Sequence, residues 1–71
     1  MQYLVVIERG ESSFGAYVPD LPGCIAAAES EAEVRELIRE AIEFHIEGLR
    51  EAGQPVPAPS SSGAVVEVGA A

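Results

Sequence analysis

The pattern of apolar and polar residues predicts one long amphipathic helix, from Ser30 to about Ala52. At about 100° per residue, apolar side chains gather on one side of this segment and charged side chains on the other. Ser30 and Glu33 have the spacing of an N-terminal capping box, while Gly53 and Pro55 mark the end. The segment is long enough to supply a hydrophobic core, through Val34, Leu37, Ile38, Ala41, Ile42, His45, Ile46 and Leu49.

Four shorter segments have the β-branched or apolar composition of strands. They are Gln2–Glu8, Phe14–Val18, Cys24–Ala28 and Ala64–Val68. The alanines of the third segment would equally suit a helix, but helical periodicity begins only after Ser30. The predicted fold is therefore α+β with the order β-β-β-α-β. A right-handed crossover would place the last strand parallel to the first, which gives a four-stranded sheet of order 3-2-1-4 with the first strand in its interior.

Two proline-containing segments connect these elements. Residues 19–23 read PDLPG, where two prolines fix the backbone and Gly23 permits a positive φ, so we expect a defined loop. Within it, the Asp20 carboxylate is expected to accept hydrogen bonds from its own turn. Residues 54–63 are rich in Pro and Ser, which is typical of a flexible connection. We expect one domain over residues 1–71.

The second face of the predicted sheet has nothing in the chain to cover it. It would carry Leu4, Val6, Tyr17 and several alanines, and monomers seldom leave such a patch open. A chain of 71 residues with a single cysteine is also too small to gain much stability from its own core. Both observations favour a homo-oligomer, a dimer or a tetramer.

The charge of the chain limits its partners. Twelve acidic residues against four arginines give a formal net charge of -8, which would repel phosphates and disfavours direct nucleic-acid binding. Such a surface suits a basic protein, although it also simply keeps a small protein in solution. Neither a signal peptide nor a membrane-spanning run is visible, so we expect a cytoplasmic protein without membrane contact.

Few residues are candidates for chemistry. His45 lies on the apolar helix face without a carboxylate to orient it, and Cys24 has no local base or cation to activate it. Asp20 and Glu8 could contribute to a two-metal nuclease site, but most acids belong to the solvent side of the helix. The sequence therefore favours a non-catalytic protein with no metal and no cofactor.

The residues together resemble the HicB-type antitoxin family. The resemblance covers almost the whole chain, and its most specific part is VPDLPGC at residues 18–24, followed by a capped helix with REAIEFHIEGLREAG and then QPVPAP at residues 54–59. It implies a partial ribonuclease-H-like fold and a scaffold role for Pro19, Asp20, Leu21, Pro22, Gly23 and Cys24. This chain has Ala28 and Ser30 where the family usually has Gly and Thr.

The resemblance also implies a function. HicB-type proteins bind and mask small basic HicA-type toxins that cleave mRNA, and many repress their own operon through a C-terminal DNA-binding segment. No such segment is visible here, so operon repression is not expected. The leading hypothesis is neutralisation of a HicA-type toxin, and the alternative is an orphan homo-oligomeric domain without a toxin. The residues expected to steer a basic partner are Glu36, Glu40, Glu43 and Glu47.

Overall fold

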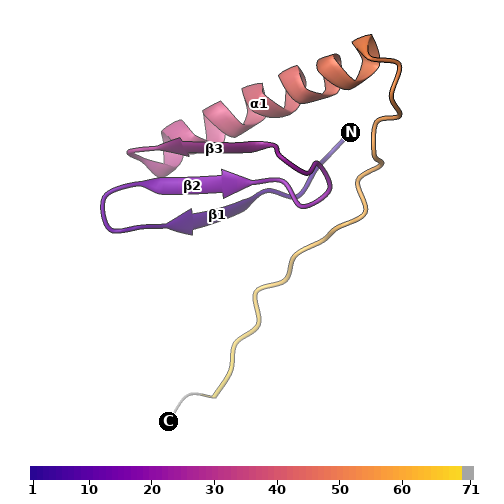
Figure 1. The fold of residues 1–71 in the computed structure, drawn as a ribbon. Coiled ribbons are helices and arrows are strands. Elements are labelled where there is room, and N and C mark those ends of the chain that lie inside the picture. Colours follow the sequence, from indigo (N-terminus) through magenta and orange to yellow (C-terminus); the bar gives the residue numbers. More distant parts are fainter. Residues whose placement is uncertain (70–71) are drawn as a thin grey trace.

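A computed structural model describes residues 1–69 of the chain. Three short strands, β1 (Val6–Arg9), β2 (Phe14–Tyr17) and β3 (Ile25–Ala28), form an antiparallel sheet of order β1-β2-β3. One long helix, α1 (Glu31–Glu51), lies across one face of this sheet (Figure 1). The α+β class, the three consecutive strands and the helix agree with the sequence prediction to within a few residues.

Alternation along the strands separates an inner face from an outer face. In the inner row, Ile7 pairs with Ala16 and Ala16 pairs with Ala26, and these side chains pack into the core. The next row, on the opposite face, is formed by Val6, Tyr17 and Ile25. Its side chains are not covered by the helix, since Tyr17 is 41% exposed and Ile25 is 70% exposed. The expected open face of the sheet is thus present.

The core is small and lies between α1 and the strands β2 and β3. Two of its side chains, Leu21 and Val34, are completely buried. Leu21 comes from the PDLPG loop, so this loop contributes to the core rather than simply connecting strands. The six buried residues are Ala16, Val18, Leu21, Cys24, Val34 and Ile38.

Backbone hydrogen bonds close the loop of residues 18–24 on itself. The Val18 amide donates to the Cys24 carbonyl at 3.2 Å, and the Leu21 amide donates to the Val18 carbonyl at 3.0 Å. The Cys24 amide donates back to the Leu21 carbonyl at 3.0 Å, and Gly23 has a φ of 87° that favours glycine. The prediction of a defined loop is confirmed.

The helix begins as the sequence predicts. Ser30 is the N-cap, and its Oγ accepts a hydrogen bond from the Glu33 amide at 3.1 Å. The Glu33 carboxylate accepts from the Ser30 hydroxyl at 3.0 Å instead of reaching the Ser30 amide. The N-cap is therefore present, but the expected hydrogen bond from the Ser30 amide to Glu33 is replaced by one from the Ser30 hydroxyl.

The helix ends in a Schellman motif. Gly53 has a φ of 70°, its amide donates to the Arg50 carbonyl at 3.1 Å, and the Gln54 amide donates to the Leu49 carbonyl at 2.9 Å. Pro55 follows Gln54 and cannot continue a helix.

Within residues 1–69, no helix combines the length and the apolar character that crossing a membrane requires.

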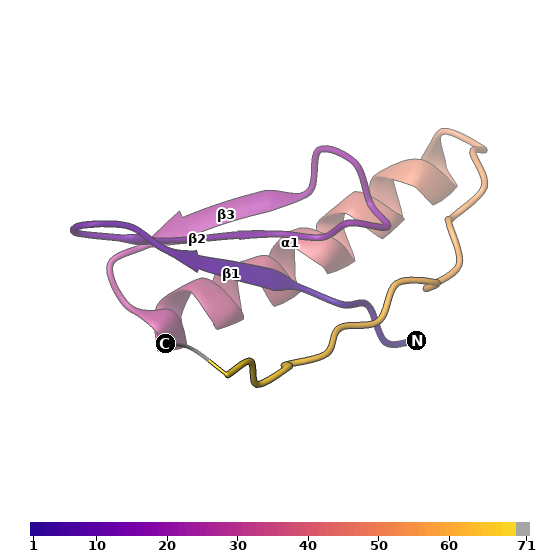
Figure 2. The same cartoon turned by 90° about the horizontal axis from the view of Figure 1, so that it is seen from below.

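The predicted fourth strand, Ala64–Val68, is not formed. After Gly53 the chain runs in an extended path past the N-terminus and away from the β1 side of the sheet (Figures 1 and 2). Residues 64–68 pair with none of the described strands, so the order 3-2-1-4 is not observed. For the same reason β1 is an edge strand and not an interior one. Alternation of apolar residues predicted the strand, but it does not specify which edge receives it.

Candidate protein-binding surfaces

Four glutamates form a stripe along α1, which we call the acidic stripe. Glu36, Glu40, Glu43 and Glu47 follow the spacing i, i+4, i+7 and i+11, so they share one line on the helix surface. All four are exposed. The stripe lies on the side of the helix opposite Val34 and Ile38, which are buried against the sheet. A partner could therefore reach it without disturbing the core.

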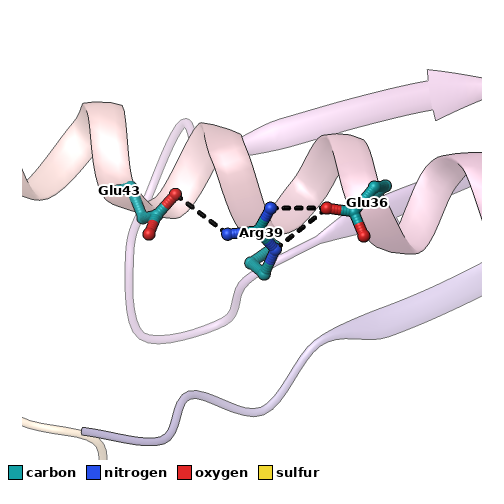
Figure 3. Close-up of polar contacts among 3 residues, drawn as sticks. All are labelled: Glu36, Arg39 and Glu43. Atoms are coloured by element: carbon teal, nitrogen blue, oxygen red, sulfur yellow. Dashed lines mark hydrogen bonds and ion pairs between the residues drawn. The ribbon is translucent and has the colours of Figure 1, made fainter.

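Arg39 divides the acidic stripe. Its Nε donates to Glu36 Oε1 at 3.1 Å, and its Nη1 donates to Glu43 Oε1 at 3.2 Å (Figure 3). The hydrogen bond that Arg39 donates to Glu36 and the negative charges of Glu36 and Glu43 raise the pKa of Arg39. These side chains are each more than half exposed, so the pairs add little to stability. Their main effect is to offset part of the stripe's charge.

Asp20 fastens the C-terminal segment to the fold. Its Oδ2 accepts hydrogen bonds from the backbone amides of Ser60, at 2.8 Å, and Ser61, at 2.9 Å. Its Oδ1 accepts from the hydroxyls of the same two residues, at 3.1 and 2.7 Å. The prediction that Asp20 bonds its own turn is wrong, because the Ser60–Ser61 pair supplies four donors in one place. We call this contact the Asp20 clamp.

The clamp stabilises the charged form of the carboxylate. The amides of Ser61 and Ser60 contribute most, and together with the hydroxyls they lower the pKa of Asp20 from 3.8 to about 2. Asp20 follows the end of β2, whereas Glu8 pairs with Gly15 near the start of that strand. The sheet therefore keeps these two acids apart, and within residues 1–69 no group of three His, Cys, Asp or Glu side chains is placed to hold a metal ion.

Cys24 and His45, the other two residues considered for chemistry, lie among groups that would not activate them. Cys24 is 4% exposed, and burial raises the pKa of its thiol. His45 is half-buried and lies beside Phe44, Gly48 and Leu49, along a shallow groove. Among the residues that the structure describes, no carboxylate lines that groove.

The motif residues of the loop divide between core and surface. Leu21 and Cys24 are buried, Asp20 is half-buried and carries the clamp, and Pro19, Pro22 and Gly23 are exposed. The structure thus brings the motif together as one loop. The acidic stripe lies apart from it, along α1.

An apolar groove lies between α1 and the N-terminal segment that leads into β1. Its volume is about 390 Å³. Ile38 and Ile42 line it from the helix, and exposed Arg35 and Arg39 stand beside them. The groove exists because α1 packs mainly against β2 and β3 and leaves the β1 side less covered. From the other wall it is lined by Tyr3, Leu4, Val5 and Ile7.

Two exposed apolar side chains, Phe44 and Ile25, were not identified from the sequence. Phe44 is 80% exposed, because its position on the helix falls outside the apolar sector. Ile25 and Tyr17 are neighbours on the outer face of the sheet. The position of Ile25 in an alternating strand, one residue before inward Ala26, is the signal that identifies it as outward-facing.

Comparison with known proteins agrees with this geometry. The family model described as HicB_like antitoxin of bacterial toxin-antitoxin system matches residues 3–68. Among solved structures, a chain of a HicA3 and HicB3 toxin-antitoxin complex superimposes with a TM-score of 0.72 and 33% sequence identity. The match covers 84% of this chain and 70% of that chain.

Relatives from a phage and from archaea extend the comparison. An uncharacterized 14.9 kDa protein of Haemophilus phage HP1 is 39% identical over 57 residues, which are 80% of this chain but only 43% of the relative. The chain thus spans less than half of that phage protein. A UPF0150 protein of Archaeoglobus fulgidus is 42% identical over 66% of this chain and 70% of its own length. One from Thermoplasma acidophilum is 34% identical over 80% of this chain and 84% of its own.

Proposed function

Because the chain belongs to the HicB-like antitoxin family, we propose that it binds and neutralises a small basic toxin of the HicA type, without catalysis of its own. The solved relative is part of a HicA3 and HicB3 complex, which supports this kind of partner. The observation that carries the proposal on this chain is the acidic stripe. It presents four exposed carboxylates on a helix face that the fold does not use.

The stripe would act first on the rate of encounter. A line of negative charge attracts a basic partner over roughly a Debye length, about 8 Å at physiological salt, and speeds association more than it adds to final affinity. Arg39 lies within the stripe and weakens its field. Removing Arg39 should therefore speed association, while removing the glutamates should slow it.

The test uses two variants that each remove four negative charges. The stripe variant carries Glu→Gln at positions 36, 40, 43 and 47, and its matched control carries Glu→Gln at the exposed positions 8, 11, 29 and 67. The neighbouring genes are first searched for a small basic protein of the HicA type, and its association with each variant is then followed by surface plasmon resonance at several salt concentrations. We expect the stripe variant to associate about 10-fold more slowly than the control at low salt.

Two results would count against the proposal. If the toxin does not bind the wild-type chain at all, the proposed function is wrong. If both variants slow association equally, net charge and not the stripe attracts the toxin.

A second candidate function is an orphan homo-oligomeric domain. It is favoured by the outer sheet face, where Tyr17 and Ile25 form an exposed apolar row with Val6. Ile25→Glu tests it without touching the core, since Ile25 is 70% exposed. A lower mass in sedimentation velocity would support assembly through this face, and an unchanged mass would exclude the face as an interface.

A further inference from the structure

Each copy of the chain carries an apolar groove that its own side chains leave unfilled. The groove runs along the β1 side of α1, with Ile38 and Ile42 on one wall and Val5 and Ile7 on the other. In residues 1–69, β1 has β2 as its one hydrogen-bonded neighbour. The outer edge of β1 therefore offers backbone groups to an added strand directly beside the groove.

Each copy also carries an apolar segment with the pattern of a strand, and this segment pairs with no strand of residues 1–69. Residues 64–68 read AVVEV, and Val65, Val66 and Val68 are 104%, 74% and 74% exposed. In an extended segment, Val66 and Val68 point to one side, and Val65 and Glu67 point to the other. Because burying the Glu67 charge would be costly, Val66 and Val68 are the pair suited to an apolar groove.

We propose that residues 64–68 of one copy add as a fourth strand to the β1 edge of a second copy, with Val66 and Val68 in its groove. The second copy returns the same contact, so that two identical chains form a strand-exchanged dimer. Such an exchange is a two-fold symmetric, closed arrangement, and strand addition supplies main-chain hydrogen bonds together with side-chain burial. Each sheet would then have the order 3-2-1-4, with its last strand from the partner.

The course of the chain favours a second copy over the chain's own groove. The Asp20 clamp fixes Ser60 and Ser61. Gly63 then lies against the Leu4 side chain, where an added Cβ would come within 3.3 Å of Leu4 Cδ1. From there the segment leaves the fold, beneath and away from β1 (Figure 1). It is thus presented outward, close to one end of the groove and outside it.

This inference goes beyond the proposed binding of a toxin and does not depend on it. It also uses a different surface from the outer sheet row of Val6, Tyr17 and Ile25. A chain that binds no toxin can still exchange strands, and a chain that does not exchange strands can still bind a toxin. The experiments below therefore use the purified chain alone.

The first experiment measures assembly by sedimentation velocity over a dilution series. The test variant carries Val66→Asp and Val68→Asp, which place two charges where the groove would take apolar side chains. The matched control carries Ala58→Asp and Ser62→Asp, which add the same charges to exposed positions outside the segment. All four positions are exposed, so these changes leave the packed part of the fold intact.

We expect the wild-type chain and the control to be dimeric, or larger if the outer face also assembles. The test variant should lose this association, with its dissociation constant raised at least about 100-fold. A wild-type chain that is monomeric at every concentration would overturn the proposal. So would a test variant that assembles as well as the control.

The second experiment asks whose groove is filled. Val66→Cys and Ile42→Cys are placed on separate chains, one with an added mass tag, and the mixture is oxidised. The wild-type chain, whose Cys24 is buried, serves as the blank. Strand exchange predicts that disulfides between Val66→Cys and Ile42→Cys chains exceed both kinds of same-variant dimer. A random 1:2:1 distribution would contradict it.

Placing both substitutions on one chain completes the test. Strand exchange predicts covalent dimers from this double variant at micromolar concentration. A disulfide that closes within single chains would show that each groove takes its own segment, and would overturn the exchange between copies.

Discussion

The packed part of the molecule, residues 5–53, and the C-terminal segment, residues 54–69, are held by different interactions. Six buried side chains, two strand pairings and a capped helix stabilise the packed part. The segment is fastened by polar contacts: the Asp20 clamp and the Tyr3 hydroxyl, which donates to the Pro57 carbonyl. Val65, Val66 and Val68 in this segment remain exposed. Apolar burial thus determines the fold, whereas a single carboxylate largely determines where the segment goes.

The largest effect is expected in the core. Leu21→Ala removes a completely buried side chain, which typically costs about 2–5 kcal/mol of the free energy of unfolding. That is a large share of the total for a domain of this size, roughly 4–10 kcal/mol. Urea denaturation followed by circular dichroism measures it. Val65→Ala in the exposed segment should change the free energy by less than about 0.5 kcal/mol, and equal losses would contradict the division into two regions.

A smaller effect is expected at the start of α1. Ser30→Ala removes the oxygen that accepts from the Glu33 amide, which should cost about 1 kcal/mol of the free energy of unfolding. Ser12→Ala is the control, since Ser12 lies exposed in the turn between β1 and β2. If the cap stabilises the packed part, Ser30→Ala should lower the urea midpoint, whereas Ser12→Ala should leave the midpoint unchanged.

Asp20→Asn should act on the segment alone. The neutral amide keeps one acceptor oxygen and loses the charge that strengthens the four hydrogen bonds of the clamp. We expect faster hydrogen exchange at the Ser60 and Ser61 amides, with exchange in the strands unchanged. The control is Glu67→Gln, which also removes one negative charge but lies outside the clamp. Faster exchange throughout the strands would show that the clamp also supports the core.

The mildest test of the clamp is its pH dependence. Since the pKa of Asp20 is lowered from 3.8 to about 2, the clamp contributes fully above about pH 4 and weakens as the pH falls towards 2. The amide chemical shifts of Ser60 and Ser61 should report this transition in NMR spectra. The Asp20→Asn variant should lack it. A midpoint near 3.8 would mean that the charged carboxylate gains nothing from the clamp.

What the sequence predicts well is local. The helix boundaries follow from Ser30, Gly53 and Pro55, whose effects reach only a few residues. The PDLPG loop is equally local, because its hydrogen bonds join residues 18–24. Periodicity places Val34 and Ile38 on the inner face, although it also assigns six further residues to that face and one of them, Leu37, is 43% exposed.

What the sequence does not predict depends on contacts between distant residues. Asp20 bonds Ser60 and Ser61, 40 and 41 residues later, and nothing in the loop itself indicates that partner. Residues 64–68 have the composition of a strand, but composition does not name the edge that they would join. The acidic stripe can be predicted from the spacing of its glutamates. The ion pairs of Arg39 cannot, because they depend on the rotamers of three long side chains.

The Asp20 clamp also acts on the reach of the segment. Without it, Ala64 would hang on a seven-residue tether from Pro57, whose carbonyl is held by the Tyr3 hydroxyl, whereas the clamp leaves only the three residues from Ser61. By random-coil scaling this confines Val65, Val66 and Val68 to a volume roughly three- to four-fold smaller, which raises their effective concentration beside any docking edge by the same factor. The Asp20 carboxylate on its loop is thereby an anchor point that limits the volume which residues 64–68 can sample.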